Sequence, residues 1–473
     1  MTRWAILAVL ALTVTGCLDG TKAPSPTADP DPWFQLDDPR IPHKPDGTGV
    51  KPAGATEAEP GFPVFGPPVR MNQTFSAHRE TSLALGPAGS GVRFACDPSG
   101  VPNIDEGQSH FFLSTDNGTT WRDLDIERAQ DDPRQVFFEG GDCDVMTGPS
   151  GELWTADSWL GSLSVGLSRD GGESWRGTSL GGSSPVADRP WLAVDGAGVL
   201  HMTYQDVQAL MPSTIWYTRV LVTENALAFA PAVSVTGPTA DGAFTWTGNL
   251  VVSDDGQDLW SVYTRRAGPV TSNLEGSGPE TVWVARSTDG GLTWASVLVS
   301  ERPNPASFLY PSLAQDAGGM LHVVFAQRTD TAHPIFHSSS TDGGLTWSEP
   351  AVVRDGVAAY SPWVAGGAAG KAAIQWYGSP DSKAELDDNE TEWFTYWATV
   401  DASNRTAVYL SGTTTEEPMF VGEQGETPEF NMVRLDEAGR IHLGLSVKAY
   451  DEEDDSTYWT AEYQVQVLGP LLA

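Results

Sequence analysis

The octet Ser287-Thr288-Asp289-Gly290-Gly291-Leu292-Thr293-Trp294 decides the fold, because its pattern, Ser-x-Asp-x-Gly-x-x-Trp, occurs four times in the chain. The other copies start at Ser114, Ser168 and Ser340, so successive starts are 54, 119 and 53 residues apart. Self-similarity at such a period indicates a repeat architecture. The long interval is about two periods, and we expect one degenerate copy within it.

Each octet predicts a tight turn between two strands. Asp and Gly supply the positive φ that such a turn requires, and the Asp carboxylate accepts hydrogen bonds from amides of the same turn. The Trp gives the next strand a large apolar face to bury. We therefore interpret four Asp and Trp pairs as structural: Asp116 and Trp121, Asp170 and Trp175, Asp289 and Trp294, Asp342 and Trp347.

A second repeat predicts the other strands of each unit. Good copies run from Pro190 to Tyr204 and from Pro311 to Phe325, each as two short alternating stretches around a glycine turn. Weaker copies begin near Glu80, Asp142, Thr247, Ser361 and Glu429. Together these copies indicate seven units.

The octets resemble the Asp box, or BNR repeat, of the sialidase superfamily and related β-propellers. The resemblance covers about residues 66–470 and implies an all-β propeller of four-stranded antiparallel blades. It also implies that the octets lie on the face away from the active site, so their Asp residues are not catalytic. Sialidases have six blades, which we keep as the alternative to the seven that the repeats favour.

The last unit, which ends at Tyr458–Tyr463, has sequence for three strands but little for a fourth. Pro67–Met71 resembles fourth strands elsewhere, such as Pro350–Arg354. We therefore expect an N-terminal strand to complete the last blade, closing the ring and removing an exposed sheet edge. The propeller domain is expected over residues 65–473.

The first residues are typical of an export signal. Arg3 precedes an apolar stretch, Trp4–Thr15, that is shorter than the roughly 20 residues needed to cross a bilayer. The stretch ends in Val14-Thr15-Gly16-Cys17, which resembles a bacterial lipobox. We expect residues 1–16 to be removed, Cys17 to carry lipid, and residues 17–64 to form a Pro/Thr/Asp-rich tether. An ordinary signal peptide with a chance cysteine is the alternative.

This lipobox resemblance implies an extracytoplasmic protein anchored in the bacterial cell envelope through its lipid, in either the inner or the outer membrane.

The composition excludes several classes of protein. The chain has 473 residues, 40% of them hydrophobic, which is enough for a core and argues against a disordered or coiled-coil protein. Its formal net charge of −35 repels a phosphate backbone, so no nucleic-acid partner is expected. We expect a monomer.

Cysteine and histidine residues have structural interpretations. Cys96 and Cys143 are expected to pair in this oxidising compartment, and two buried thiols are the alternative. Three histidines occupy the same strand position in three different units, so they cannot hold one metal ion together: His201, His322 and His442.

The resemblance places a functional site on the propeller face opposite the octets. The segments entering the units supply a polar and aromatic mouth there. Trp246, Tyr310 and Glu429 are the candidate binding residues, and the candidates for catalysis are Arg79, Glu80, Asp142, Asp188, Arg189 and Tyr360.

A sialidase clamps the substrate carboxylate with three arginines and uses a Tyr nucleophile with a Glu base and an Asp acid. Arg79 and Arg189 match two of the arginines, and the chain offers no convincing third. Tyr360 resembles the nucleophile. Asp142 or Asp144 matches the acid, and Glu80 or Glu429 matches the base. An ion pair of Asp188 and Arg189 that caps a strand is the structural alternative.

Acidic loops lie on the same predicted face and would repel an anionic sugar. Carboxylate oxygens are the ligands of Ca²⁺, so calcium is the one cofactor that the sequence allows, although none is certain. The candidate ligands are Asp387, Asp388, Asp451 and Asp454. Solvated loops without a ligand are the alternative.

Three functions follow from these features. The favoured one is a surface-anchored propeller that binds a glycan or a protein without catalysis. The second is an exo-α-sialidase or related retaining glycoside hydrolase, and the third is a non-catalytic envelope scaffold.

Overall fold

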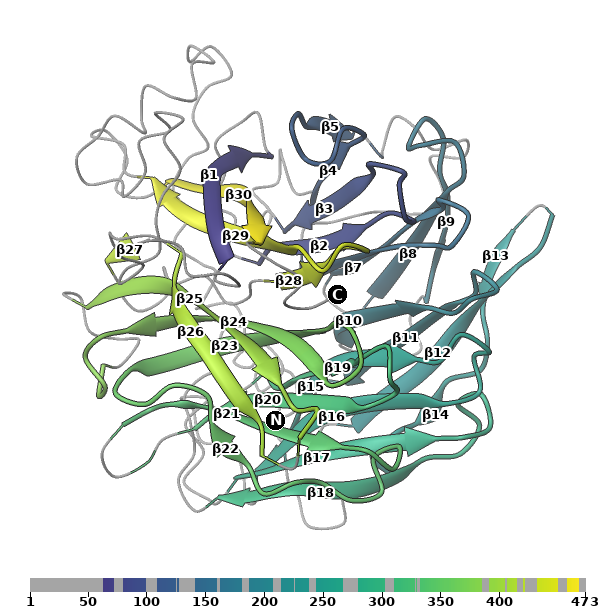
Figure 1. Cartoon of the computed structure of the whole chain (residues 1–473). Coiled ribbons are helices and arrows are strands. Elements are labelled where there is room, and N and C mark those ends of the chain that lie inside the picture. Colours follow the sequence, from purple (N-terminus) through teal and green to yellow (C-terminus); the bar gives the residue numbers. More distant parts are fainter. Residues whose placement is uncertain are drawn as a thin grey trace, which may run out of the picture.

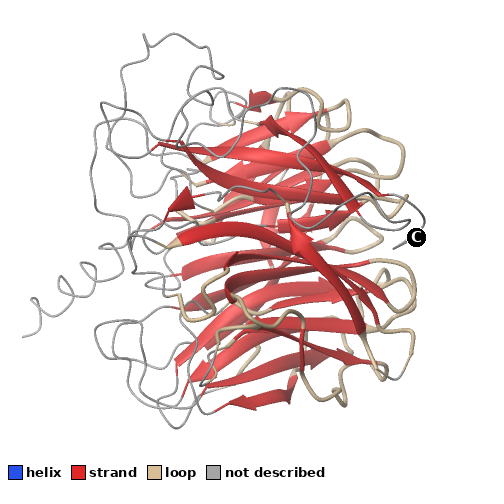
Figure 2. Ribbon diagram, turned by 60° about the vertical axis from the view of Figure 1, so that its left-hand side comes forward, coloured by secondary structure: helices blue, strands red, loops and turns tan. Residues whose placement is uncertain are grey.

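The computed structural model describes residues 63–71, 80–98, 109–124, 126, 141–159, 162–180, 187–206, 214–224, 226–237, 244–266, 280–302, 310–327, 329, 332–384, 391–404, 406–414, 420–421, 432–449 and 457–467. Within these ranges the regular elements are all strands (Figure 2). The predicted signal peptide, Cys17 and nearly all of the predicted tether lie outside them. No helix in the described ranges is long and apolar enough to cross a membrane.

The described strands form seven antiparallel sheets (Figure 1). The first four sheets along the chain are β2 (Ser82–Leu85), β3 (Arg93–Asp97), β4 (His110–Ser114) and β5 (Arg122–Leu124); β6 (Cys143–Thr147), β7 (Leu153–Trp159), β8 (Ser162–Ser168) and β9 (Arg176–Ser179); β10 (Ala187–Val194), β11 (Leu200–Asp206), β12 (Thr214–Val222) and β13 (Leu227–Phe229), with β14 (Val233–Ser234) beside β12; and β15 (Phe244–Val252), β16 (Leu259–Arg266), β17 (Glu280–Ser287) and β18 (Ala295–Arg302).

The remaining sheets follow the same order. They are β19 (Ser312–Gln315), β20 (Leu321–Ala326), β21 (Ile335–Ser340) and β22 (Ala351–Val352); β23 (Ala358–Gly366), β24 (Lys371–Ser379), β25 (Glu392–Asp401) and β26 (Val408–Thr413), with β27 (Phe420–Val421) beside β25; and β28 (Met432–Leu435), β29 (Ile441–Ala449) and β30 (Thr457–Val467), with β1 (Pro63–Arg70) beside β30.

The first strand of each sheet contacts the first strand of the next. Contacts run from β2 to β6, β10, β15, β19, β23 and β28 in turn, and β28 contacts β2 again. The sheets therefore surround a common axis, with these seven strands innermost. This arrangement is an all-β propeller of four-stranded antiparallel blades.

The N-terminal strand pairs with the C-terminal one. β1 runs antiparallel to β30, with Phe65 opposite Val465 and Val69 opposite Glu462 (Figure 1, purple against yellow). Phe65 is fully buried, and its ring centroid lies 6.0 Å from that of Trp397 in the neighbouring β23–β26 blade. The two ends of the described chain thus share one sheet, and β1 also packs against the blade before it.

Burial separates inner from outer strands. β24 is buried at nearly every residue, because its two faces are covered by the neighbouring blades. The outer strand β26 instead begins with exposed and partly exposed residues, and Val408 is 64% exposed. The hydrophobic cores lie between adjacent blades, which is where the continuous apolar stretches of the inner strands are needed.

All four octets form the same hydrogen-bonded turn between the third and fourth strands of a blade. In the octet of β17 and β18, the Ser287 hydroxyl accepts from the amide of Gly291 at 2.9 Å and donates to Asp289 at 2.8 Å. The Asp289 carboxylate accepts from the amide and hydroxyl of Thr293, at 2.9 and 2.6 Å. These hydrogen bonds lower the pKa of Asp289 to about 2. The Asp289 carboxylate stabilises the turn, as predicted.

Octets also join neighbouring blades. Tyr217 in β12 donates to the carbonyl of Gly290 at 3.3 Å, and Trp260 in β16 donates to Gly343 at 2.9 Å. The next position must remain glycine, because a Cβ on Gly291 would lie 2.0 Å from the Tyr217 ring and φ there is +85°. The turn that stabilises one blade therefore also fixes its distance from the preceding blade.

The degenerate copy lies in the β10–β14 blade, where the connection of β12 to β13 lacks the octet. Thr223 closes this turn by donating its hydroxyl to the carbonyl of Ala226 and accepting from the Ala226 amide, both at 3.0 Å. A threonine turn thus replaces the octet where the sequence pattern is lost.

The three repeated histidines are structural, as predicted. Each contacts the Asp of the turn between the first two strands of its own blade: His201 with Asp195, His322 with Asp316 and His442 with Asp436. They lie in three different blades and share no ligand set. Cys96 and Cys143 form a disulfide, which confirms the predicted pairing.

Candidate functional site

The chain enters every blade at one end of the propeller. Because the strands alternate in direction, this end is opposite the turns between third and fourth strands, where the octets lie. Candidate residues from five successive blades occur at these entries: Glu80 before β2, Asp142 before β6, Asp188 and Arg189 in β10, Trp246 in β15 and Tyr310 before β19. The topology therefore gathers residues that are far apart in the sequence.

Arg189 is the centre of this group. Its Nη1 atom lies 3.5 Å from Oε2 of Glu80, and its Nε atom lies 3.3 Å from Oδ2 of Asp142. The guanidinium carbon lies 4.6 Å from the centroid of the Tyr310 ring, which is a cation–π distance. Four blades thus meet at one side chain. We call Glu80, Asp142, Asp188, Arg189 and Tyr310 the Arg189 cluster.

The backbone of Arg189 is strained. Its φ is +53°, a left-handed conformation that non-glycine residues rarely adopt, and Pro190 follows it. The pairing of β10 with β11 shifts register here, between Asp188 and Trp191. Such a bulge redirects a side chain and is frequent beside functional sites. From this position the Arg189 side chain makes ion pairs with two other blades.

The pKa values of the two aspartates in the cluster are shifted in opposite directions. Burial raises the pKa of Asp142, but the Arg189 guanidinium and hydrogen bonds from Glu80 and Asp188 outweigh it and hold this pKa below its usual value. Burial and the negative charge of Asp142 raise the pKa of Asp188 well above its usual value. The cluster therefore combines a carboxylate with a carboxyl group that retains its proton to higher pH.

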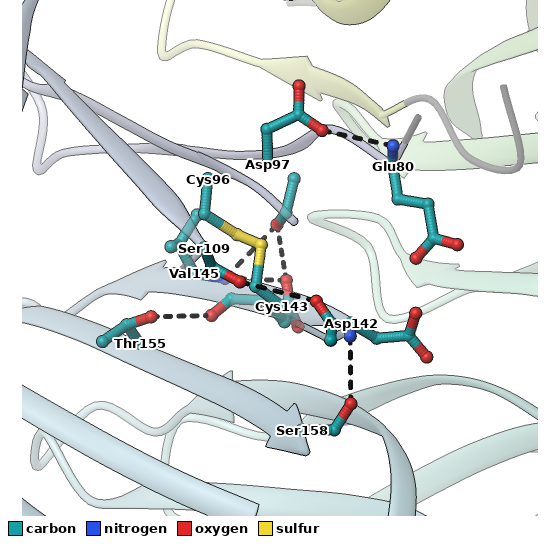
Figure 3. Close-up of a disulfide and its surroundings, with 12 residues drawn as sticks. Glu80, Cys96, Asp97, Ser109, Asp142, Cys143, Val145, Thr155 and Ser158 are labelled. Atoms are coloured by element: carbon teal, nitrogen blue, oxygen red, sulfur yellow. Dashed lines mark hydrogen bonds between the residues drawn. A yellow bond between two sulfur atoms is a disulfide. The ribbon is translucent and has the colours of Figure 1, made fainter. Parts of the chain in front are cut away.

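The disulfide supports this side of the cluster. Cys143 directly follows Asp142, and Cys96 directly precedes Asp97, whose Oδ1 accepts from the amide of Glu80 at 3.2 Å (Figure 3). The amide of Asp142 donates to the Ser158 hydroxyl at 3.0 Å. Both acidic partners of Arg189 are therefore held through their backbone amides beside one covalent link between two blades.

Two aromatic residues extend the cluster. The rings of Trp246 and Tyr310 meet edge to face with centroids 5.7 Å apart. Tyr310 is 5% exposed, whereas Trp246 is half-buried. The predicted binding residues are therefore in contact, and Tyr310 connects them to the charged residues through Arg189.

Asp144 has a different role from the acid that the sequence allowed. It is 3% exposed and bridges three blades, because it accepts from the Ser82 hydroxyl at 2.6 Å and from the amide of Leu192 at 2.8 Å. Burial raises the pKa of Asp144 to about 6, although these hydrogen bonds and the positive charge of Arg434 act to lower it. Asp144 therefore links inner strands near the axis, and Arg434, which the sequence analysis did not select, is its cationic neighbour.

Tyr360 does not fit the predicted role of an accessible nucleophile. Its side chain is 3% exposed and packs in the core, with its ring 5.4 Å from that of Tyr377 and 4.9 Å from that of Trp393. It occupies the same place in its blade as Asp188, and the following residue, Ser361, has a φ of +48°. Both blades have a bulge at this position, but Tyr360 stands where the β10 blade has Asp188, and its ring fills the core.

Several predictions lie outside the described residues. Arg79 and Glu429 are among them, as are the four candidate calcium ligands, Asp387, Asp388, Asp451 and Asp454. In the ranges that the structure does describe, no group of three or more His, Cys, Asp or Glu side chains is arranged to hold a metal ion. The calcium hypothesis therefore stays a prediction.

Comparisons with known proteins agree with this architecture. No family model matches the chain. A sialidase of Micromonospora viridifaciens is 34% identical over 126 residues, which are 22% of this chain and 19% of that protein. Over that segment the chain is similar to this sialidase, and its fold is a β-propeller. It matches only about a fifth of that sialidase, given the 19% coverage.

Two solved structures resemble this propeller over most of its length. One is a polysaccharide lyase of family PL25, an ulvan lyase, with a TM-score of 0.51 and 11% identity over 83% of this chain and 95% of that one. The other is the polysaccharide lyase Uly1, with a TM-score of 0.50 and 9% identity over 82% and 90%. At these identities the likeness concerns the fold.

Proposed function

We propose that this sialidase-like propeller binds carbohydrate at the Arg189 cluster. The observation that carries the proposal is the meeting of Arg189 with Glu80, Asp142 and Tyr310, each from a different blade. Binding sites typically combine aromatic walls with a few convergent polar groups, and sugar hydroxyls need both donors and acceptors. The Arg189 cluster offers these groups at the strand entries, away from the structural octets.

Known proteins support the same class of ligand. The sequence relative is named a sialidase, and the two solved structures of similar fold are named polysaccharide lyases. Fold likeness alone does not determine function, so the local chemistry of the Arg189 cluster is the stronger support. Its half-buried Trp246 ring and partly exposed Asp142 side chain, at 18%, are groups that a ligand can reach.

A glycan panel tests this proposal. The purified chain is expected to bind at least one glycan, and Asp142→Asn should weaken that binding at least about tenfold, because one charged acceptor is lost. Glu173→Gln is the control, since Glu173 is exposed in an octet and pairs with Arg122 at 3.5 Å. Absence of glycan binding, or equal affinities for the wild type and Asp142→Asn, would contradict the proposal.

A glycoside hydrolase is the second candidate. It is favoured by the opposite pKa shifts of Asp142 and Asp188, since glycosidases use one protonated and one ionised carboxyl group. Here Asp188 would donate the proton and Asp142 would be the charged partner. Release of reducing sugar by the wild type and its loss in Asp188→Asn would support hydrolysis; binding without release would contradict it.

We also propose that the chain is a lipoprotein anchored at Cys17 in the bacterial cell envelope, and that its octets are BNR repeats. The lipobox-like Val14–Cys17 and the octet pattern support this. Incorporation of a labelled fatty acid during expression in bacteria, abolished by Cys17→Ser, is the expected result. Labelling that survives Cys17→Ser would contradict the anchor.

We further propose that the seven sheets are seven blades of one ring, closed by the N-terminal strand. The contacts between successive innermost strands and the pairing of β1 with β30 support this closure. The substitution of Phe65 described in the Discussion tests the contribution of β1.

A further inference from the structure

The Arg189 cluster has more carboxyl groups than cationic groups. Three carboxyl side chains, those of Glu80, Asp142 and Asp188, surround the single guanidinium of Arg189. The Arg189 side chain is 11% exposed and is already in contact with two of them. Its positive charge is therefore balanced within the protein before any ligand arrives.

Two nitrogens of the guanidinium already contact acidic side chains. Nη1 faces Glu80, Nε faces Asp142, and the guanidinium carbon lies 4.6 Å from the centroid of the Tyr310 ring. A ligand carboxylate that paired bidentately with Arg189 would have to displace one of these protein carboxylates and remain beside the other. In this partly buried position, repulsion between like charges is screened less than at an open surface.

A neutral sugar is not repelled by these acidic side chains. Its hydroxyl groups donate to carboxyl oxygens of Asp142 and Glu80 without displacing the ion pairs of Arg189. Half-buried Trp246, beside Tyr310, offers an apolar ring for the carbon face of a sugar. The polar groups of the cluster match hydroxyl chemistry better than they match an anion.

We propose that the Arg189 cluster selects neutral glycans and rejects acidic ones, that is, sialylated and uronic acid-containing glycans. This inference rests on the proposed carbohydrate-binding function. Glu80 and Asp142 act as the selectivity residues, because their carboxyl groups occupy the guanidinium of Arg189, which a clamp for an acidic sugar would need unpaired.

A panel of paired glycans tests this selectivity. Each neutral oligosaccharide is matched with the same oligosaccharide carrying a terminal sialic acid or uronic acid, and binding to the purified full chain is measured at low salt. We expect at least tenfold tighter binding of the neutral member. Glu80→Gln should narrow this difference at least threefold by removing the carboxyl group that pairs with Nη1 of Arg189, and Glu173→Gln, outside the cluster, should leave it unchanged.

Each outcome bears on a different claim. Equal or tighter binding of the acidic members overturns the selectivity and leaves carbohydrate binding intact. If the affinity difference between neutral and acidic glycans is the same in Glu80→Gln and in Asp142→Asn as in the wild type, these two residues do not determine the selectivity. Failure of every pair to bind overturns the proposed function as well. The wild-type comparison needs no variant, so the inference stays testable even where a substitution prevents folding.

Discussion

Replacing both Cys96 and Cys143 with serine is expected to lower the free energy of unfolding by about 4 kcal/mol. The disulfide closes a loop between residues 47 positions apart, and a link of this length removes much of the conformational freedom of the unfolded chain. Both cysteines are also buried in the core between the β2–β5 and β6–β9 blades. The expected loss is a large part of the stability of an ordinary domain.

Urea unfolding of the wild type and of the Cys96→Ser/Cys143→Ser variant measures this difference. Wild type unfolded in a reducing agent is the matched control, because it loses the same link without the serine hydroxyls. A variant within about 1 kcal/mol of the oxidised wild type would contradict the prediction. The variant should also bind glycan more weakly, since the disulfide flanks Asp142 and Asp97.

Phe65→Ala is expected to cost about 3–5 kcal/mol of stability. Phe65 is fully buried in β1 and packs against Trp397, so truncation leaves a cavity where the N-terminal strand meets the neighbouring blade. If β1 closes the ring, weakening it opens the contact between the first and last parts of the chain.

Thermal and urea unfolding measure the Phe65 effect. Val408→Ala is the control, because Val408 lies in an outer strand and is 64% exposed, so its truncation should change the stability by less than about 0.5 kcal/mol. Equal stabilities of Phe65→Ala and Val408→Ala would mean that β1 contributes little to the closed propeller.

The fold could be predicted from local chemistry. Each octet carries its own turn, with a Ser and an Asp that bond to amides within five residues, so the sequence pattern and the structure coincide. The structural role of the repeated histidines, which lie in three non-adjacent blades, was predictable from their shared strand position. In the β10–β14 blade, where a Thr223 turn replaces the octet, the repeat could only be inferred from the spacing.

The site was predictable only in part, because its contacts join different blades. Glu80, Asp142 and Arg189 were selected individually from their places at strand entries, but their ion pairs depend on the closed ring. Tyr360 was selected by resemblance, and its burial could not be seen in the sequence because the repeated bulge admits either an acid or a core aromatic.

Asp144 is another residue whose role could not be predicted from the sequence. It lies two residues after Asp142 in the chain, and both are acids near one strand entry. Asp142 pairs with Arg189, whereas Asp144 accepts from Ser82 and Leu192. Alternation along a strand would put residues two apart on the same face, but Asp142 precedes β6, so the bend at the strand entry separates their roles.

A crystal structure of the chain with the glycan that it binds most tightly would show where the ligand lies. We expect a neutral sugar in contact with the Arg189 cluster, with hydroxyl groups within hydrogen-bond distance of Asp142 or Asp188 and a sugar face near Trp246. A glycan bound on the octet face or along the outer strands, with the Arg189 cluster unchanged, would contradict it.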